Sequence, residues 1–187
     1  FIGVAAAVIE AMFDPEVLNE RAALVQRGSL RASIAMDRLP PARKWVGEGP
    51  NMEHQVTFES EGLKLTGVVH TPDDMVPGER RPAMLVLHGF GSNKSSGNSI
   101  GPAEMFCDWG YITMRFDFRG CGESEGEYGR IICLEQVEDT KSALGYLQTR
   151  DDVDPGRIGA VGSSFGAAVA VYTGGVDERL AAVISSG

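Results

Sequence analysis

The segment from Arg157 to Ala168 constrains the fold of this chain more than any other. It passes from a short apolar run into Gly-Ser-Ser-Phe-Gly at 162–166 and then into small residues that are compatible with a helix. This order predicts a strand, a sharp turn with Ser164 at its apex, and a helix. Glycines two positions before and two positions after Ser164 remove the side chains that such a turn would crowd.

Two interpretations of this turn are open from the pentapeptide alone. In the first, Ser164 is a nucleophile, because the turn raises its hydroxyl above the sheet and beside the amino end of a helix, where an oxyanion is stabilised. In the second, residues 162–166 are a glycine- and serine-rich turn without chemistry. The rest of the sequence has to decide between them.

The composition is that of a globular protein and argues against several classes of partner. The 187 residues suit one domain of ordinary size, with 43% hydrophobic and 23% charged residues. The net charge of −9 argues against nucleic acid and against an anionic membrane surface. Cys107, Cys121 and Cys133 lack the spacing of a zinc site or a disulfide framework, so we expect reduced thiols in the cytoplasm.

Residues 1–50 are predicted to form a helical N-terminal segment and linker ahead of a second unit, residues 51–187. Asp14-Pro15-Glu16 is a helix start signal, and the proline- and glycine-rich stretch 40–51 is typical of a connector. The apolar stretch 1–13 contains Glu10 and lacks the basic region and cleavage site of a signal peptide, which favours a packed helix. A cap, a dimerisation arm and the remnant of an upstream domain all remain open for this segment.

From residue 52 onward the pattern is one of strands alternating with helices. Alternating residues at 55–60 and 63–70 flank Glu61-Gly62 and predict an antiparallel hairpin. Nearly continuous apolar runs at 83–88 and 111–116 predict strands buried on both faces. A strand leading to Ser164 follows the turn at 154–157, and residues 180–185 predict a last strand.

Three helices are expected between these strands: one around 102–109, one over 134–149, and one from the serine turn to about residue 173. Strands alternating with helices predict an α/β fold with a mainly parallel sheet covered on both faces. The core stripe predicted for the middle helix consists of Leu134, Val137, Ala143, Leu144 and Leu147.

Two further glycine-rich loops support the first interpretation of Ser164. Residues 89–101 and 117–126 each follow a predicted strand. In parallel sheets the functional groups gather outside the carboxyl ends of the strands, which is where both loops and the serine turn would lie. Ser164 is therefore predicted to be a nucleophile.

Three motifs together resemble the α/β-hydrolase family. They are His-Gly-Phe-Gly at 88–91, Asp-Phe-Arg-Gly-Cys-Gly-Glu-Ser at 117–124 and Gly-Ser-Ser-Phe-Gly at 162–166, in the order that the family has them. The second motif is similar to that of feruloyl (cinnamoyl) esterases and of related acyl hydrolases and peptidases. The resemblance covers the chain from about residue 52 and implies a mainly parallel α/β-hydrolase sheet with an N-terminal hairpin.

The resemblance also implies roles for individual residues. Ser164 would attack an acyl carbonyl and form an acyl-enzyme, while the backbone N–H groups of Phe165 and Phe90 would bind the oxyanion. His88 is expected to shape its loop rather than act as the general base. Asp117 and Arg119 are expected to brace their loop by ion pairing. The implied activity is that of a carboxylic ester hydrolase acting on a small acyl ester, with no cofactor and no metal.

The acid and the histidine of the family follow the nucleophile along the chain. This sequence has no histidine after His88, and it ends about one strand after Ser164. We therefore expect an N-terminal part of a hydrolase, truncated after about the sixth strand, with the acid and the histidine outside it. An amidase or peptidase is the nearest alternative, and a catalytically silent interaction module is another. A homodimer through residues 1–50 or through the open sheet edge is left open.

Overall fold

The computed structural model describes residues 52–186, which form a six-stranded mixed sheet and three helices. The expectations for residues 1–50 lie outside the described residues. The strands are β1 (Met52–Ser60), β2 (Leu63–Thr71), β3 (Arg81–Leu87), β4 (Ile112–Phe116), β5 (Val153–Ser163) and β6 (Leu180–Ser186). The helices are α3 (Gly97–Asp108), α4 (Cys133–Gln148) and α5 (Phe165–Val176).

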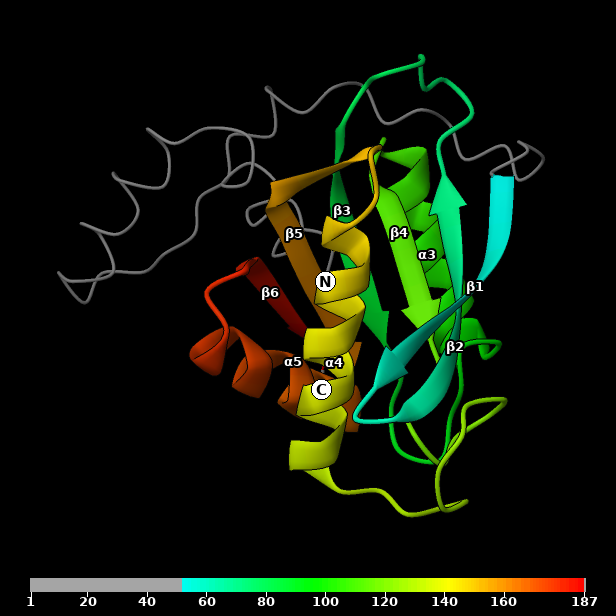
Figure 1. Ribbon diagram of the computed structural model, residues 1–187, viewed down its shortest axis with the longest axis vertical. Helices are drawn as coiled ribbons and strands as arrows, with labels where there is room; N and C mark the ends of the chain where they lie inside the picture. The colour runs from blue at the N-terminus through cyan, green and yellow to red at the C-terminus, as the bar shows by residue number, and fades with distance from the viewer. Residues whose placement is uncertain (1–51, 187) are drawn as a thin grey trace, which may run out of the picture. The chain divides into compact units, whose positions relative to one another are not determined.

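The strands lie in the order β1-β2-β4-β3-β5-β6 across the sheet (Figure 1). β1 pairs with β2 and β2 with β4 in antiparallel fashion, whereas β4, β3, β5 and β6 are mutually parallel neighbours. The expected mainly parallel sheet with an N-terminal hairpin is therefore confirmed. Because the four parallel strands run the same way, their carboxyl ends meet at one end of the sheet.

The hairpin forms because its turn residues accept positive φ angles. Ser60 pairs with Leu63, so Glu61 and Gly62 make a two-residue turn, with φ of 46° and 81°. Positive φ at both positions matches the right-handed twist of the flanking strands. Phe58 of β1 then packs edge-on against Phe116 of β4, with ring centroids 5.4 Å apart, which ties the hairpin to the core.

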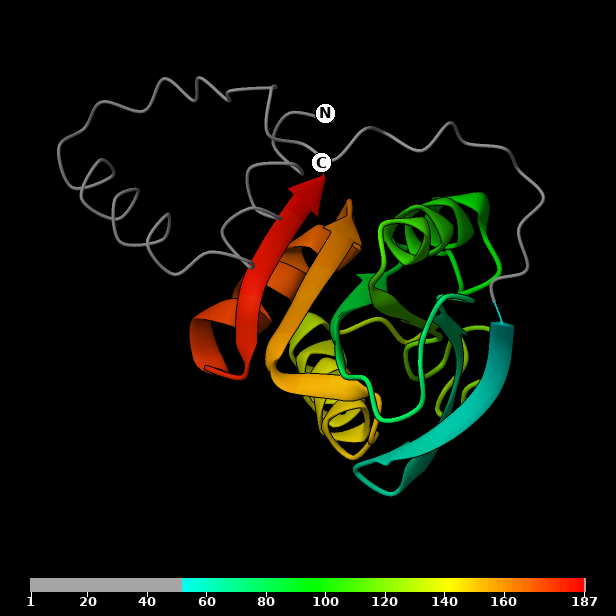
Figure 2. The same cartoon turned by 90° about the horizontal axis from the view of Figure 1, so that it is seen from above.

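The two faces of the sheet are covered by different helices. Figures 1 and 2 show α3 on one face and α4 with α5 on the other. In β3 every residue from Pro82 to Leu87 is buried, and in β4 all five residues are, as expected of strands covered on both sides. Within residues 52–186 no helix has the length and apolar character needed to span a bilayer.

The core stripe of α4 differs from the prediction at one position. Val137, Ala143, Leu144 and Leu147 are buried as expected, but Leu134 is 57% exposed. Cys133 packs against the core in its place. Positions separated by four residues share a helix face, so the buried stripe continues from Val137 back to Cys133, and the prediction of Leu134 was wrong.

The helix α3 begins earlier than predicted, at Gly97, so the loop after β3 is shorter than residues 89–101. Ser96 adopts the extended conformation of an N-cap, and its carbonyl accepts the N–H groups of Ser99 and Ile100, both at 2.9 Å. Pro102 consequently lies inside the helix rather than at its start, where proline is usually found. At the other end of the fold, α5 runs past the expected end near residue 173 to Val176.

The turn predicted at 154–157 is an irregularity within β5. Val153 pairs with Arg81, whereas the next paired residue of β5, Ile158, is opposite Ala83. The intervening residues of β5 therefore bulge out of the ladder. Proline and glycine are tolerated in a strand at such a bulge because the ladder hydrogen bonds are interrupted there.

Candidate active site

Ser164 is the single residue between the end of strand β5 and the start of helix α5. β5 ends at Ser163 and α5 begins at Phe165, and Ser164 itself has φ 52° and ψ −118°. A positive φ is uncommon for a residue with a side chain and persists only where the surroundings fix it. Here the Ser164 N–H donates to the Ser186 carbonyl at 2.7 Å, and the Ser164 carbonyl accepts the Ala167 N–H at 3.0 Å. The side chain is exposed at the carboxyl end of the sheet.

The glycines around Ser164 are required by close packing. A Cβ atom on Gly162 would overlap the backbone of Gly166. A Cβ atom on Gly166 would lie 2.5 Å from the carbonyl oxygens of Leu87 and His88, at the end of β3. The turn is therefore wedged against the neighbouring strand, and only glycine fits at either position.

Within residues 52–186, the first N–H groups of α5 have no hydrogen-bond acceptor. The first helical N–H with a partner is that of Ala167, which donates to the Ser164 carbonyl. The N–H of Phe165 has no hydrogen-bond acceptor among residues 52–186, as is usual in the first turn of a helix. Free donors at a helix amino end, where the helix dipole is positive, attract an anion.

The loop between β3 and α3, residues 88–96, lies directly against the serine turn. A Cβ atom on Gly89 would be 3.2 Å from the Ser163 carbonyl oxygen and 3.4 Å from the Ser164 Cβ. Phe90 is 71% exposed, and its ring meets that of Phe165 edge-on at 6.2 Å between centroids. The Phe90 N–H finds no acceptor in the described part of the chain. The structure thus brings together Ser164, Phe165 and Phe90, the three residues singled out from the sequence.

His88 is buried and both of its ring nitrogens are engaged. Its Nε2 accepts the Phe118 N–H at 3.2 Å, and its Nδ1 donates to the Gly89 carbonyl at 2.9 Å. Burial lowers the pKa of the imidazole, and the Gly89 carbonyl and Asp117 oppose this only in part. His88 therefore holds the ends of β3 and β4 together and has no free nitrogen to accept a proton from Ser164.

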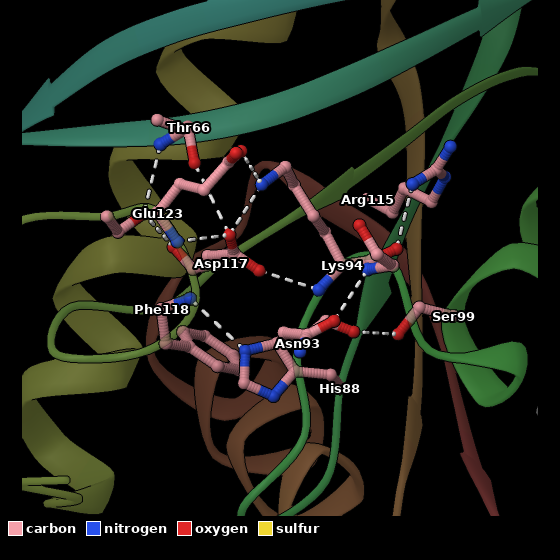
Figure 3. A network of polar contacts seen from close by, with 11 residues as sticks. Thr66, His88, Asn93, Lys94, Ser99, Arg115, Asp117, Phe118 and Glu123 are labelled. Carbon is pink, nitrogen blue, oxygen red and sulfur yellow. Dashed lines mark hydrogen bonds and ion pairs between the residues drawn. The ribbon is translucent and has the colours of Figure 1, made fainter. Parts of the chain in front are cut away.

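The charges of Asp117 and Arg119 are both paired within the protein, and these ion pairs hold the loop after β4. Asp117 is fully buried, and its carboxylate accepts from the backbone and the Nζ of Lys94, both at 2.6 Å, and from the Glu123 N–H at 2.9 Å (Figure 3). The Arg119 guanidinium pairs with Asp139 of α4 at 2.7 Å and with Glu61 of the hairpin at 2.9 Å. This geometry fits the bracing role expected for both residues.

Two residues near the site were missed by the sequence motifs, namely Lys94 and Arg115. Arg115 is the one charged residue in the mainly apolar segment 111–116, which is a signal that it has a buried partner. It donates to His70 Nε2 at 2.9 Å and to the Lys94 carbonyl at 2.8 Å. Lys94 lies in a serine-rich loop whose composition gives no indication that the side chain is buried.

Cysteine chemistry is disfavoured at this end of the sheet. Cys121 is buried in the loop after β4, where burial, together with Asp117 and Asp139, raises the pKa of its thiol. Near the end of α3, ahead of the start of β4, burial likewise raises the pKa of Cys107 to about 12. A raised thiol pKa leaves little thiolate, which is the nucleophilic form. Among residues 52–186 no group of three or more His, Cys, Asp or Glu side chains is placed to hold a metal ion.

A small hollow of about 190 Å³ adjoins the serine turn. It opens beside Ser163 rather than at Ser164 itself, and its walls come from β3, α3, β5 and β6. Its size suits one small apolar group rather than a whole drug-sized ligand. The lining residues are Val86, Leu87, Asn98, Pro102, Val161, Gly162, Ser163 and Ser186.

Comparison with known proteins places the chain in a family. The model of the X-Pro dipeptidyl-peptidase (S15) family matches residues 61–186, which is most of the chain. The chain belongs to this S15 family of α/β hydrolases. The α/β-hydrolase resemblance noted from the three motifs is thereby confirmed.

Individual relatives agree with this assignment. The quorum-quenching protein AidA of Acinetobacter baumannii is 34% identical over 143 residues, which cover 76% of this chain and 46% of AidA. The α/β hydrolase GrgF from Penicillium superposes with a TM-score of 0.66 at 27% identity, over 71% of this chain and 45% of GrgF. Est1E from Butyrivibrio proteoclasticus, solved with ferulic acid, has a TM-score of 0.63 at 20% identity over 68% of this chain and 50% of its own, and shows the fold alone. The chain thus spans about half the length of the relatives it matches.

Proposed function

We propose that the whole protein is a serine hydrolase that cleaves carboxylic acyl esters through an acyl-enzyme on Ser164. The observation that carries this proposal is the conformation of Ser164, at φ 52° between the end of β5 and the start of α5. It exposes a hydroxyl next to the first residue of α5 and against the loop that carries Phe90, and neither the Phe165 N–H nor the Phe90 N–H has an acceptor among residues 52–186. A nucleophile and an unoccupied pair of donors are what acyl transfer requires.

In the proposed reaction the Ser164 hydroxyl oxygen bonds to the acyl carbonyl carbon while a base removes the hydroxyl proton. The carbonyl oxygen becomes an oxyanion that accepts hydrogen bonds from the Phe165 and Phe90 N–H groups. Collapse of this intermediate expels the alcohol, which takes up the proton, and leaves the acyl group on Ser164. Water then attacks the acyl-enzyme carbonyl in the same way, so that the bond to Ser164 breaks, the carboxylic acid leaves and the serine oxygen takes up a proton.

The base and the acid that orients it are proposed to lie outside this chain. His54 is exposed on β1, remote in the sheet order from β5, and His70 is buried against Arg115. His88 has both nitrogens bonded. Since the chain spans about half of its relatives, a histidine in the remainder of the polypeptide is the proposed general base.

An ester substrate is preferred over an amide because the motif at 117–124 is similar to that of feruloyl esterases. A peptidase is the second candidate, because the matching family is described as X-Pro dipeptidyl-peptidase. The experiment compares p-nitrophenyl butyrate with an X-Pro p-nitroanilide as substrates of the full-length protein. We expect the wild type to hydrolyse the ester and Ser164→Ala to lose about 10⁴-fold or more in kcat. Ser95→Ala, in the exposed part of the neighbouring loop, should keep the wild-type kcat.

The alternative outcomes point to the other candidates. Cleavage of the anilide with little ester turnover would favour the peptidase. No turnover of either substrate by the full-length protein would favour a catalytically silent module.

The compartment proposed is the cytoplasm. Cys107, Cys121 and Cys133 are all free. Unpaired thiols are typical of a reducing compartment, which supports this location. Fractionation of the source cells tests it, and recovery of the protein outside the cytoplasmic fraction would contradict it.

A further inference from the structure

A buried lysine holds the loop that carries Phe90. Lys94 is 3% exposed, yet it lies only four residues after Phe90, which is 71% exposed. Its backbone N–H and its Nζ both bind the Asp117 carboxylate at 2.6 Å, its Nζ also pairs with Glu123, and its carbonyl accepts from Arg115 at 2.8 Å. Figure 3 shows Lys94 enclosed by these groups. The residue is thus fixed by both its backbone and its side chain.

The groups that hold Lys94 are themselves fixed. Arg115 and Asp117 stand on either side of Phe116 at the end of β4. Arg115 also donates to His70 of β2 at 2.9 Å and to Glu53 of β1 at 3.0 Å. Asp117 also receives the Glu123 N–H at 2.9 Å. The anchor of the loop is therefore continuous with three neighbouring strands of the sheet.

Lys94 carries its charge in this setting. Burial alone would lower its pKa, but the hydrogen bonds to Asp117 and Glu123 raise the pKa above its usual value. Glu123 is largely exposed, whereas Asp117 is fully buried. Asp117 is thus the partner whose pairing depends most on Lys94.

The loop has a second anchor on the other side of Phe90. His88 Nε2 accepts the Phe118 N–H, so both ends of residues 88–94 are tied to the end of β4. Between the anchors, Gly89 abuts the Ser163 carbonyl and the Ser164 side chain. The position of the Phe90 N–H relative to Ser164 is consequently set by these two anchors.

We infer that Lys94 is a positioning residue, whose paired contact with Asp117 sets the place of the Phe90 N–H beside Ser164. The inference rests on the proposed function, since it assigns Lys94 a task in binding the oxyanion. A buried ion pair is poor evidence of a gain in stability, because apolar substitutes often stabilise a protein as well. What the pair supplies is a fixed geometry, because Lys94 makes two hydrogen bonds to one carboxylate. This geometry holds the Phe90 N–H, and displacement of that donor would weaken the stabilisation of the transition state.

The test uses the full-length protein and three variants. Lys94→Met removes the charge and keeps the length of the side chain. The double variant Lys94→Met with Asp117→Asn removes both charges, so that no buried carboxylate is left uncompensated if the single variant does not fold. Lys141→Met is the control, because Lys141 pairs with Glu138 on the surface of α4.

Two readouts separate positioning from folding. One is the split between kcat and KM for p-nitrophenyl butyrate. The other is the affinity for a trifluoromethyl ketone, which adds to serine and forms an oxyanion, relative to the affinity for the matching methyl ketone. We expect either Lys94 variant to lower kcat by about tenfold or more, with KM little changed and the relative ketone affinity reduced by a similar factor. The control should match the wild type in both.

The outcomes are distinct. If the Lys94 variants fold and differ from the wild type only in thermal stability, with kcat and relative ketone affinity unchanged, the inference is wrong while the proposed function stands. A wild-type protein that neither hydrolyses esters nor binds the trifluoromethyl ketone would refute both. A lower kcat together with a weaker preference for the trifluoromethyl ketone over the methyl ketone supports the positioning role.

Discussion

Gly89 and Ser164 lie so close together that a Cβ atom on Gly89 would be 3.4 Å from the Cβ of Ser164. The same atom would be 3.2 Å from the Ser163 carbonyl oxygen, closer than most real contacts of a Cβ atom. A side chain at residue 89 would therefore force the loop after β3 or the Ser163 carbonyl to shift by a few tenths of an ångström. This contact brings the Phe90 N–H to the same end of the sheet as the Ser164 hydroxyl.

Gly89→Ala tests the contact directly. The added methyl group should push the loop away from the serine turn and move the Phe90 N–H from the oxyanion. We expect kcat for ester hydrolysis to fall by about ten- to a hundredfold, approaching the loss of one oxyanion donor. Gly97→Ala is the matched control, because no atom in the described part of the chain lies within 4 Å of a Cβ atom there. Equal kcat values for the two variants would contradict the expected geometry.

Gly166→Ala should destabilise the fold. Its Cβ atom would be 2.5 Å from two carbonyl oxygens at the end of β3, and neither backbone group can move freely. We expect a loss of about 3 kcal/mol in the free energy of unfolding, measured by urea denaturation. For Gly175→Ala in the same helix, no atom of residues 52–186 lies within 4 Å of the new Cβ, so the variant should be neutral or stabilise by up to about 1 kcal/mol. Equal stabilities would show that the turn is not wedged against β3.

His70 should make stability depend on pH. Burial, then the charge of Arg115, lower its pKa to about 4 from 6.5, against an opposing effect of Glu53. Between these two values the unfolded chain binds a proton at this residue and the folded protein does not, so the free energy of unfolding falls as the pH is lowered. Over the whole pH range between the two pKa values, the free energy of unfolding should fall by about 3 kcal/mol.

His70→Gln provides the comparison for this effect. The glutamine oxygen can accept the Arg115 Nε–H that His70 Nε2 accepts now, but glutamine does not titrate. Urea denaturation of both proteins between pH 7 and pH 4 should show a weaker loss of stability in the variant. His88, whose pKa is also lowered by burial, should leave part of the slope in place. Parallel curves would rule out His70 as a source of the pH dependence.

Arg119→Met should lower stability without lowering reactivity. It leaves the Asp139 carboxylate, which is fully buried, without the guanidinium that pairs with it at 2.7 Å. We expect a loss of about 3–5 kcal/mol in the free energy of unfolding. Arg130→Met, which breaks an exposed pair with Glu135, should leave the free energy of unfolding nearly unchanged. A fall in kcat in folded Arg119→Met would instead indicate contact with the substrate.

The parts of the fold that were predicted from sequence are those with local causes. The hairpin follows from alternation on either side of Glu61-Gly62, and both turn residues have the positive φ that such a turn needs. The turn at Ser164 follows from two glycines that the packing requires. Buried strands such as β3 follow from their continuous apolar runs.

The features that were missed depend on contacts between distant residues. The start of α3 lies in a segment of serine, glycine and asparagine without apolar periodicity. Ser99 is buried there, and its hydroxyl donates to the Asn93 carbonyl. The pairing of Lys94 with Asp117 joins two loops, and its extension through Arg115 to His70 joins two strands. No local pattern encodes such partners, so Lys94 could only be recognised in the structure.

Labelling of the full-length protein with a fluorophosphonate, followed by mass spectrometry of its peptides, tests most directly whether Ser164 is the nucleophile. The reagent adds to serines whose hydroxyl is activated, and its phosphonyl oxygen binds where an oxyanion would. We expect one adduct, on Ser164, that is absent from the Ser164→Ala variant and from heat-denatured protein. Labelling at another residue, or none at all in a folded full-length protein, would contradict the assignment of Ser164 as the nucleophile.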